Sequence, residues 1–194
     1  MGSVIASAVV SLDGFIADPD DGVGPLFDWY HNGPVEVYGT DQSRPFHVSQ
    51  ASADYLNDTW PNVRVCIIGR RLFDLTNGWH GVPAVGDHVI VVTHQPPTDW
   101  PFPDAPFTFA TSIEEAVTQA RHRAGDGDIS ITGGNLTGQA LTAGLVDEIA
   151  YNLAPVLLGA GRRFFDTYTG PQRLLDNPRV VQGNRVTHLH YRLS

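Results

Sequence analysis

An apolar strand pattern that runs into two glycines carries the strongest signal for chemistry in this sequence. The segment spans residues 129–138 and reads ISITGGNLTG, with a helical pattern directly after Gly134. Glycines let the backbone approach a ligand where a Cβ would collide, and the N–H groups of a helix N-terminus favour an anion such as pyrophosphate. The segment lacks the P-loop lysine and does not fit G-x-G-x-x-G, so neither standard nucleotide motif applies. The alternative for these residues alone is a tight turn without a ligand.

Two further turns follow apolar strand patterns. The apolar run 65–68 is followed by Gly69, Arg70 and Arg71, and the run 88–92 is followed by Thr93 and His94. Arginines at a helix start oppose the helix dipole unless an anion offsets them, and a guanidinium binds phosphate through two hydrogen bonds. Solvated arginines are the alternative. Because ligands of open α/β sheets collect at the carboxyl ends of strands, the three turns together predict a dinucleotide site. The basic side chains favour the 2′-phosphate of NADPH over NADH.

Carboxylates near the first strand are the candidates for acid chemistry. Asp13 and Gly14 form a sharp turn after residues 4–10, and Asp28 lies in the segment LFDWY of residues 26–30, with Glu36 a weaker third candidate. Each has a structural alternative: Asp13 can form an Asx turn, and Asp28 can cap a helix or face solvent.

The sequence predicts no metal site. Residues 18–22, DPDDG, resemble a calcium loop only superficially, because Trp29 stands where the bidentate glutamate belongs, and we expect a turn-rich flexible loop. His188 and His190 share one face of a predicted strand, but no third ligand is near them in sequence.

Composition excludes several classes of protein. The chain of 194 residues is 42% hydrophobic and carries a net charge of −9, which predicts a folded domain and argues against a nucleic-acid partner. All 12 basic residues are arginine, so Schiff-base, pyridoxal phosphate, P-loop and kinase chemistry that needs a lysine is excluded. The one cysteine, Cys66, lies in an apolar run and is expected to be a small buried hydrophobe. Without a long apolar run or a basic leader, we expect a cytoplasmic protein with no membrane partner.

Strand and helix patterns alternate along the chain and predict one mixed α/β domain over residues 1–194. Helices are expected at 50–56, 71–75 and 136–143, and from Thr111 or Ser112, each followed three residues on by a glutamate, to Gly125. Residues 180–186 suggest a hairpin that adds antiparallel strands at one edge. The predicted fold is a three-layer αβα sandwich around a mostly parallel sheet. The strands are expected at 4–10, 63–68, 88–93, 129–132, 148–153 and 185–193.

Several blocks resemble the reductase domain of bacterial riboflavin-biosynthesis deaminase/reductase proteins, within the dihydrofolate reductase-like superfamily. They are SLDGFIA at 11–17, IGRR at 68–71, TGGNL at 132–136, LVDE at 145–148 and PVLLGAGRRFF at 155–165, and together they span nearly the whole chain. Since Cys66 is the one cysteine, we expect no counterpart here of the zinc-binding deaminase domain of those proteins.

The resemblance implies an NADPH-dependent reductase that acts on a riboflavin precursor, 5-amino-6-ribosylaminouracil phosphate, or on a pteridine or folate, and that forms a homodimer. By resemblance, Ile16 and Ala17 flank the nicotinamide, while Asp28 and Asp13 are the candidate catalytic carboxylates. The spacing of Asp28 from Ile16 is about one residue shorter than in dihydrofolate reductases. A non-catalytic NADPH-binding or ligand-sensing protein of the same fold is the alternative. The other cofactor contacts implied are the adenylate phosphates at Gly69, Arg70 and Arg71, the adenosine at Thr93 and His94, and the pyrophosphate at Gly133, Gly134, Asn135, Leu136 and Thr137.

Overall fold

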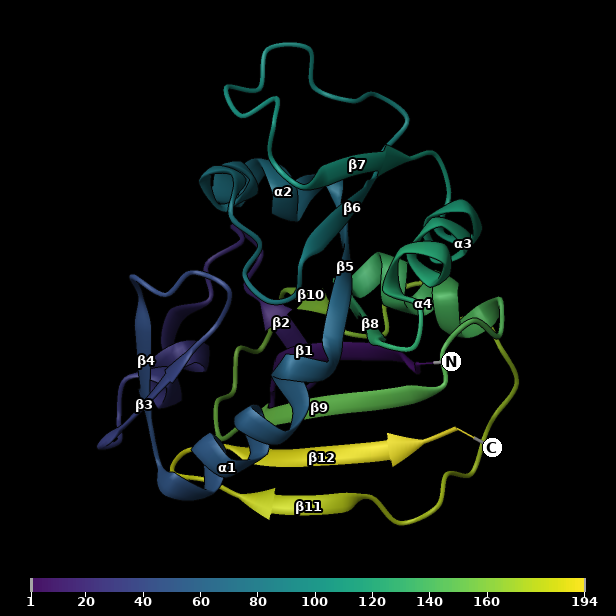
Figure 1. The fold of residues 1–194 in the computed structure, drawn as a ribbon. Coiled ribbons are helices and arrows are strands. Elements are labelled where there is room, and N and C mark those ends of the chain that lie inside the picture. Colours follow the sequence, from purple (N-terminus) through teal and green to yellow (C-terminus); the bar gives the residue numbers. More distant parts are fainter. Residues whose placement is uncertain (1, 194) are drawn as a thin grey trace.

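An eight-stranded mixed sheet forms the centre of the molecule in a computed structural model that describes residues 2–193 (Figure 1). The strand order is β11-β12-β9-β1-β8-β5-β6-β7, and the strands from β9 to β7 in this order pair in parallel. β12 is antiparallel to β9, and β11 to β12. These strands are β1 (Val4–Ser11), β5 (Val63–Gly69), β6 (His88–Val92), β7 (Phe107–Ala110), β8 (Asp128–Thr132), β9 (Glu148–Ala154), β11 (Arg179–Gln182) and β12 (Thr187–Arg192).

Helices cover both faces of the sheet and make three layers. α3 (Ile113–Ala124) and α4 (Gly134–Thr142) lie on one face, and α1 (Gln50–Thr59) and α2 (Arg70–Thr76) on the other (Figure 1). Alternate strand residues explain this division: Val65 and Ile67 of β5 join the core under α3 and α4, whereas Ile68 joins the cluster under α2. Both faces of the inner strands are therefore apolar, as parallel strands require.

Short elements complete the chain around this sheet. β2 (Phe15–Ala17) pairs with β10 (Arg162–Arg163), and β3 (Val35–Tyr38) pairs with β4 (Pro45–Val48), in two separate two-stranded sheets. 3₁₀ helices span Gly24–Tyr30 and Trp60–Asn62, and the segment Asn77–Gly81 is a turn with left-handed backbone at Gly78, Trp79 and His80.

The predicted α/β fold is confirmed, including the antiparallel strands at its C-terminal edge. Each strand and helix expected from apolar patterning is present, with ends that differ by two residues or fewer except where α1 continues to Thr59. The sequence reasoning missed β7, which has four residues and follows the proline-rich connection from β6, and it missed the short strands β2, β3, β4 and β10. These strands are too short to show a periodic pattern.

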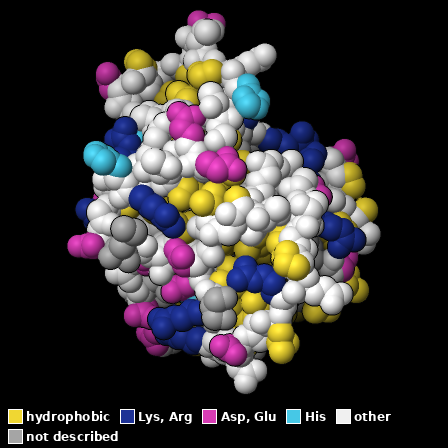
Figure 2. Space-filling view, turned by 90° about the vertical axis from the view of Figure 1, so that its right-hand side faces the viewer, with side chains coloured by type: hydrophobic (Ala, Val, Ile, Leu, Met, Phe, Trp, Pro, Cys, Tyr) yellow, Lys and Arg dark blue, Asp and Glu magenta, His cyan; other side chains and the backbone are white. Residues whose placement is uncertain are grey.

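The surface shows interspersed charges. On the face in Figure 2, arginine side chains are separated from one another by neutral and acidic residues, and hydrophobic side chains show between them. Within residues 2–193, no helix is long and apolar enough to cross a bilayer.

Candidate functional site

The turn between β8 and α4 contains two glycines, of which Gly133 has free space beside its backbone and Gly134 is packed against another segment of the chain. Gly133 has φ +129°, a region that favours glycine, and a Cβ built there would meet nothing within 4 Å. A Cβ at Gly134 would lie 2.1 Å from the carbonyl oxygen of Arg163. The first glycine therefore leaves space for a ligand, whereas the second is required by contact with the chain itself.

Three more residues of this turn hold its shape. Thr137 is fully buried, and both its backbone N–H and its hydroxyl donate to the carbonyl of Gly133. Leu136 is buried, and Asn135 is exposed and accepts a hydrogen bond from Gln139. The N–H groups at 134–136 precede the first helical hydrogen bond of α4 and have no acceptor among the described residues. These groups are the donors that an anion would meet at this turn.

The turn after β5 lies beside this one. A Cβ built at Gly69 would lie 3.6 Å from Cδ1 of Leu136, an ordinary contact distance. Because β5 and β8 are neighbours in register, their carboxyl ends and the two glycine turns meet at one edge of the sheet. The structure thus brings two of the three predicted turns together, at 69 and at 133–134.

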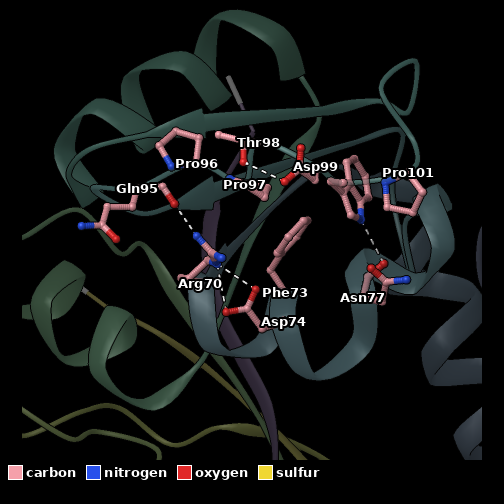
Figure 3. A pocket seen from close by; sticks show the side chains of 11 residues that line it. Arg70, Phe73, Asp74, Asn77, Gln95, Pro96, Pro97, Thr98, Asp99 and Pro101 are labelled. Carbon is pink, nitrogen blue, oxygen red and sulfur yellow. Dashed lines mark hydrogen bonds and ion pairs between the residues drawn. The ribbon is translucent and has the colours of Figure 1, made fainter.

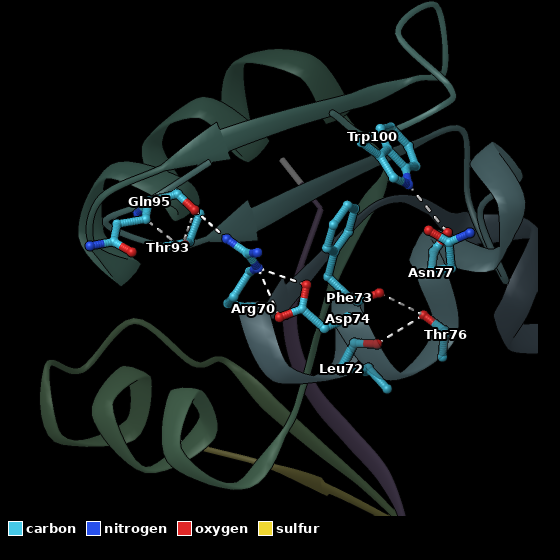
Figure 4. Close-up of polar contacts among 9 residues, drawn as sticks. All are labelled: Arg70, Leu72, Phe73, Asp74, Thr76, Asn77, Thr93, Gln95 and Trp100. Atoms are coloured by element: carbon cyan, nitrogen blue, oxygen red, sulfur yellow. Dashed lines mark hydrogen bonds and ion pairs between the residues drawn. The ribbon is translucent and has the colours of Figure 1, made fainter. Parts of the chain in front are cut away.

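Arg70 starts α2 and is bound by its own chain. Its Nε donates to both carboxylate oxygens of Asp74, at 2.7 and 2.9 Å, and its Nη1 donates to the carbonyl of Gln95 (Figure 4). The carbonyl of Gln95 also accepts from the Thr93 hydroxyl, which in turn accepts from the Gln95 N–H. The turns after β5 and β6 are thus joined by the guanidinium, while His94 is exposed beside them.

A groove runs between α2 and the connection from β6 to β7. Figure 3 shows Arg70 and Asp74 on one wall and the segment from Gln95 to Pro101 on the other, with Phe73 between them. The groove has a volume of about 420 Å³, and its lining includes Trp100, whose indole N–H donates to the carbonyl of Asn77. The groove therefore lies next to the turn after β6 that carries Thr93 and His94.

Arg71 binds a carboxylate from the loop between β2 and the 3₁₀ helix at Gly24–Tyr30. Its Nε donates to Oδ1 of Asp21 at 2.7 Å and its Nη2 donates to Oδ2. Arg162 of β10 binds the same carboxylate. The two guanidinium groups lower the pKa of Asp21 to about 2. The anion that offsets Arg71 at the start of α2 is supplied here by the protein.

The loop after β1 reaches the site through β2. Ala17 is buried and pairs with Arg162, whereas Ile16 between the pairing positions is partly exposed. The guanidinium of Arg163 lies 4.7 Å from the centre of the Phe15 ring. Segment 161–166 therefore contacts both the loop after β1 and, through Gly134, the N-terminus of α4.

Asp13 ties the loops after β1 and β9 together. Its carboxylate accepts hydrogen bonds from the Ser11 hydroxyl, from the Gly159 N–H at 2.7 Å and from the Leu158 N–H at 3.2 Å. The hydrogen bond from Ser11, with help from the two backbone donors, lowers the pKa of Asp13 to about 2. These contacts indicate an ionised carboxylate that positions two loops.

The other acid candidates lie at the surface. Asp28 is exposed on the 3₁₀ helix, while its neighbour Trp29 is buried, and no described side chain binds the Asp28 carboxylate. Glu36 of β3 is exposed and accepts a hydrogen bond from Tyr38.

His188 lies in a buried polar network under α1. Its Nδ1 lies 2.6 Å from Oδ1 of Asn152, which can only accept, and its Nε2 lies 3.0 Å from the Ser52 hydroxyl. The ring stacks on Tyr55 with centroids 4.2 Å apart, and burial lowers the pKa of His188 to about 4. His190 instead pairs with Glu148. Among the described residues no group of three or more His, Cys, Asp or Glu side chains could hold a metal ion.

Aromatic side chains near the 3₁₀ helix Gly24–Tyr30 pack on one another. Tyr30 stacks on Trp29 with centroids 3.8 Å apart and contacts Phe46 and Trp60. These rings belong to the core cluster between α1 and the sheet. Core packing therefore accounts for them.

Sequence reasoning did not select Asp21 or Arg162, which the structure places against Arg71. The sequence does offer one signal for Arg162: it belongs to an arginine pair that directly follows Gly159 and Gly161, next to a turn. Nothing local links Asp21 to either arginine, because the partners are 50 and 141 residues apart.

The fold and this edge define the class of protein. A parallel sheet with Gly69, Thr93 and Gly133 at its carboxyl ends, extended by antiparallel C-terminal strands, is a dihydrofolate reductase-like fold. Residues 2–188 match the family described as the RibD C-terminal domain, and the chain belongs to this family. No curated protein matches the sequence.

Solved structures of low sequence identity share the fold. A protein from Shewanella sp. PV-4 whose name places it in riboflavin biosynthesis has 19% identity and a TM-score of 0.65, with 98% of each chain covered. A pyrimidine reductase-like protein from Corynebacterium diphtheriae has 15% identity and a TM-score of 0.65, with 98% of this chain and 91% of that chain covered. A diaminohydroxyphosphoribosylaminopyrimidine deaminase/5-amino-6-(5-phosphoribosylamino)uracil reductase from Thermotoga maritima has 14% identity and a TM-score of 0.62, with 100% of this chain but 57% of that chain covered.

Proposed function

We propose that this protein is an NADPH-dependent reductase whose substrate is a small heterocycle of the ribosylaminopyrimidine type that precedes riboflavin. The observation that carries the proposal is the meeting of the two glycine turns at one sheet edge, with unpaired N–H groups at 134–136 and open space at Gly133. Family membership and the name of the Thermotoga maritima enzyme support the substrate class.

The residues present fit a dinucleotide. The open backbone at Gly133 would hold the pyrophosphate, the groove beside Arg70 would hold the adenosine, and Ile16 would lie against the nicotinamide. When bound, the cofactor supplies the hydride, and the chain supplies orientation and a site from which water is excluded. The second glycine of the turn has the separate task of admitting segment 161–166.

Proton delivery is assigned to Asp28 within this proposal. Asp13 is ionised and fully engaged by its donors, so it suits loop positioning better than proton donation. The Asp28 carboxylate has no partner among the described side chains and is free to meet a substrate.

Calorimetry with NADPH and NADH tests the cofactor assignment. We expect tighter binding of NADPH, because Arg70 and Arg71 offer charge to the 2′-phosphate, and a narrower gap in the Arg70→Ala variant. The Gly133→Ala variant should bind NADPH at least about tenfold more weakly, because a Cβ restricts the φ of +129° and fills the open space. Gly144→Ala is the matched control, since Gly144 also has positive φ and open space but lies after α4, at its other end.

Turnover tests the reaction itself. Oxidation of NADPH should be seen by absorbance with a phosphorylated ribosylaminopyrimidine and not with dihydrofolate. Equal affinity for the two nicotinamide nucleotides would contradict the arginine assignment. Absence of turnover with both substrate classes, in protein that binds NADPH, would contradict the reductase assignment.

A further inference from the structure

Asp21 is a carboxylate enclosed by two arginines from distant parts of the chain. Arg71, the second residue of α2, binds both carboxylate oxygens, and Arg162 of β10 binds Oδ1. The Asp21 side chain is 10% exposed, whereas those of Arg71 and Arg162 are 58% and 40% exposed. The anion is therefore covered while its two cationic partners remain open to solvent.

The loop that carries Asp21 is closed on itself. Oδ1 of Asp18 accepts the N–H groups of Asp20 and Gly22, both at 2.8 Å, and the Asp18 N–H donates to the carbonyl of Gly22. Asp21 sits at the tip with φ +67°, in the left-handed region that asparagine and glycine also adopt. The loop thus presents one carboxylate to the arginines as a preformed unit.

We propose that Asp21 is an internal ligand of a two-arginine anion site, and that a phosphate group of the nicotinamide nucleotide binds Arg71 and Arg162 by displacing it. This inference rests on the proposed function and adds Arg162 to the binding residues. Carboxylate and phosphate oxygens accept the same two-pronged guanidinium hydrogen bonds, so one group can replace the other. With Asp21 in place the three side chains carry one net positive charge, and with Asp21 displaced the arginines offer two to a phosphate dianion.

The energetics allow the exchange. Ion pairs in which the cations are largely exposed to solvent contribute little net stability, so opening the contact is not prohibitive. The nucleotide affinity is nevertheless reduced in proportion to the fraction of molecules in which the arginines are free. Loop 18–22 therefore sets the affinity for the cofactor and moves when the cofactor binds.

The test is the Asp21→Asn variant, which keeps side-chain size and the left-handed backbone but removes the competing charge. Calorimetry is carried out on the wild type and the variant with two probes, NADPH and inorganic pyrophosphate. We expect D21N to bind both probes about tenfold more tightly than the wild type. In the D21N background, Arg162→Ala should abolish this gain.

Asp20→Asn is the matched control. It removes the same charge from the same loop, but the Asp20 side chain is exposed and contacts neither arginine, and its N–H remains available to Asp18. We expect D20N to bind both probes as the wild type does. Thermal melting followed by circular dichroism verifies that each variant is folded.

The outcomes separate this inference from the proposed function. If NADPH binds D21N no more tightly than it binds the wild type, Asp21 forms a purely structural ion pair with the arginines. The displacement inference is then overturned, while the proposed function stands. If pyrophosphate binds D21N more tightly but NADPH binds no variant, the anion site stands and the proposed cofactor fails. If neither probe binds D21N, the anion site itself is overturned.

Discussion

Asp13 holds the loops after β1 and β9 together. Its carboxylate receives the N–H groups of Leu158 and Gly159, and its pKa is lowered to about 2 by the Ser11 hydroxyl and these backbone donors. We expect Asp13→Ala to speed hydrogen exchange at the amides of 158 and 159, measured by NMR. Ser11→Ala, which leaves the carboxylate in place, should speed it less.

The same contact has a defined pH dependence. Because the folded pKa of Asp13 lies below the ordinary value of 3.8, its stabilising effect is present above that value and is lost as the pH falls through about 2. Protection of the Gly159 amide should therefore persist to pH 4. Loss of that protection between pH 7 and pH 5 would contradict this assignment.

His188 is kept neutral in the folded protein, whereas Asp13 is kept charged. Burial lowers its folded pKa to about 4 from 6.5, so the unfolded chain binds a proton first and stability falls as the pH drops from about 6.5 to about 4. The full difference corresponds to about 3 kcal/mol in the free energy of unfolding. Urea denaturation of the wild type and of His188→Phe, which keeps an aromatic ring beside Tyr55, measures it.

The destabilisation caused by H188F should be largest near pH 7 and shrink toward pH 4, where the wild type has lost the contribution of its neutral histidine. A difference in the free energy of unfolding that stays constant over this range would show that His188 does not titrate as described.

At the scale of elements, the start of α3 can be traced to a few residues. The Ser112 hydroxyl accepts the Glu115 N–H at 3.2 Å, and the Glu115 carboxylate accepts from both the N–H and the hydroxyl of Thr111. We expect Ser112→Ala to lower the free energy of unfolding by about 1 kcal/mol in denaturant titration. Thr118→Ala, further along the same helix on an exposed position, is the control and should change it less.

The contact between α4 and segment 163–168 depends on the absence of a side chain. Gly138 is buried, and a Cβ built there would lie 1.8 Å from the carbonyl oxygen of Asp166. We expect Gly138→Ala to destabilise the protein by about 2 kcal/mol or more, despite the higher helix propensity of alanine. Gln139→Ala, on the exposed side of the same helix, should be nearly neutral; a neutral G138A would contradict the contact.

Elements specified by contacts within a few residues were predicted from the sequence, and elements specified by contacts between distant residues were missed. Long apolar runs such as 63–68 specify inner strands, and Ser112 with Glu115 specifies a helix start, because the required contacts lie within a few residues. β10 has two residues, and its pairing with β2 is decided by contacts more than 140 residues apart. The glycine turns after β5 and β8 were predictable because each directly follows an apolar strand, whereas the contact between Asp21 and Arg162 was not, because the two residues are 141 positions apart.

At the scale of the whole molecule, stability should decrease from the centre of the sheet to its edges. β1, β8 and β5 are central and covered on both faces, with Val4, Ile131 and Ile67 fully buried. β11 is an edge strand with mostly exposed side chains, and Val180 is 56% exposed. Because local opening costs least where few apolar contacts are broken, β11 should open without the rest of the sheet.

Native-state hydrogen exchange measures this gradient. Amides of β8 should exchange only through global unfolding, with free energies of opening that follow added denaturant, while those of β11 should exchange through small openings that denaturant barely affects. β12, which is held to the body by His188 and by pairing with β9, should lie between them. Equal opening free energies in β8 and β11 would contradict this gradient, because they would mean that the C-terminal hairpin unfolds only together with the centre of the sheet.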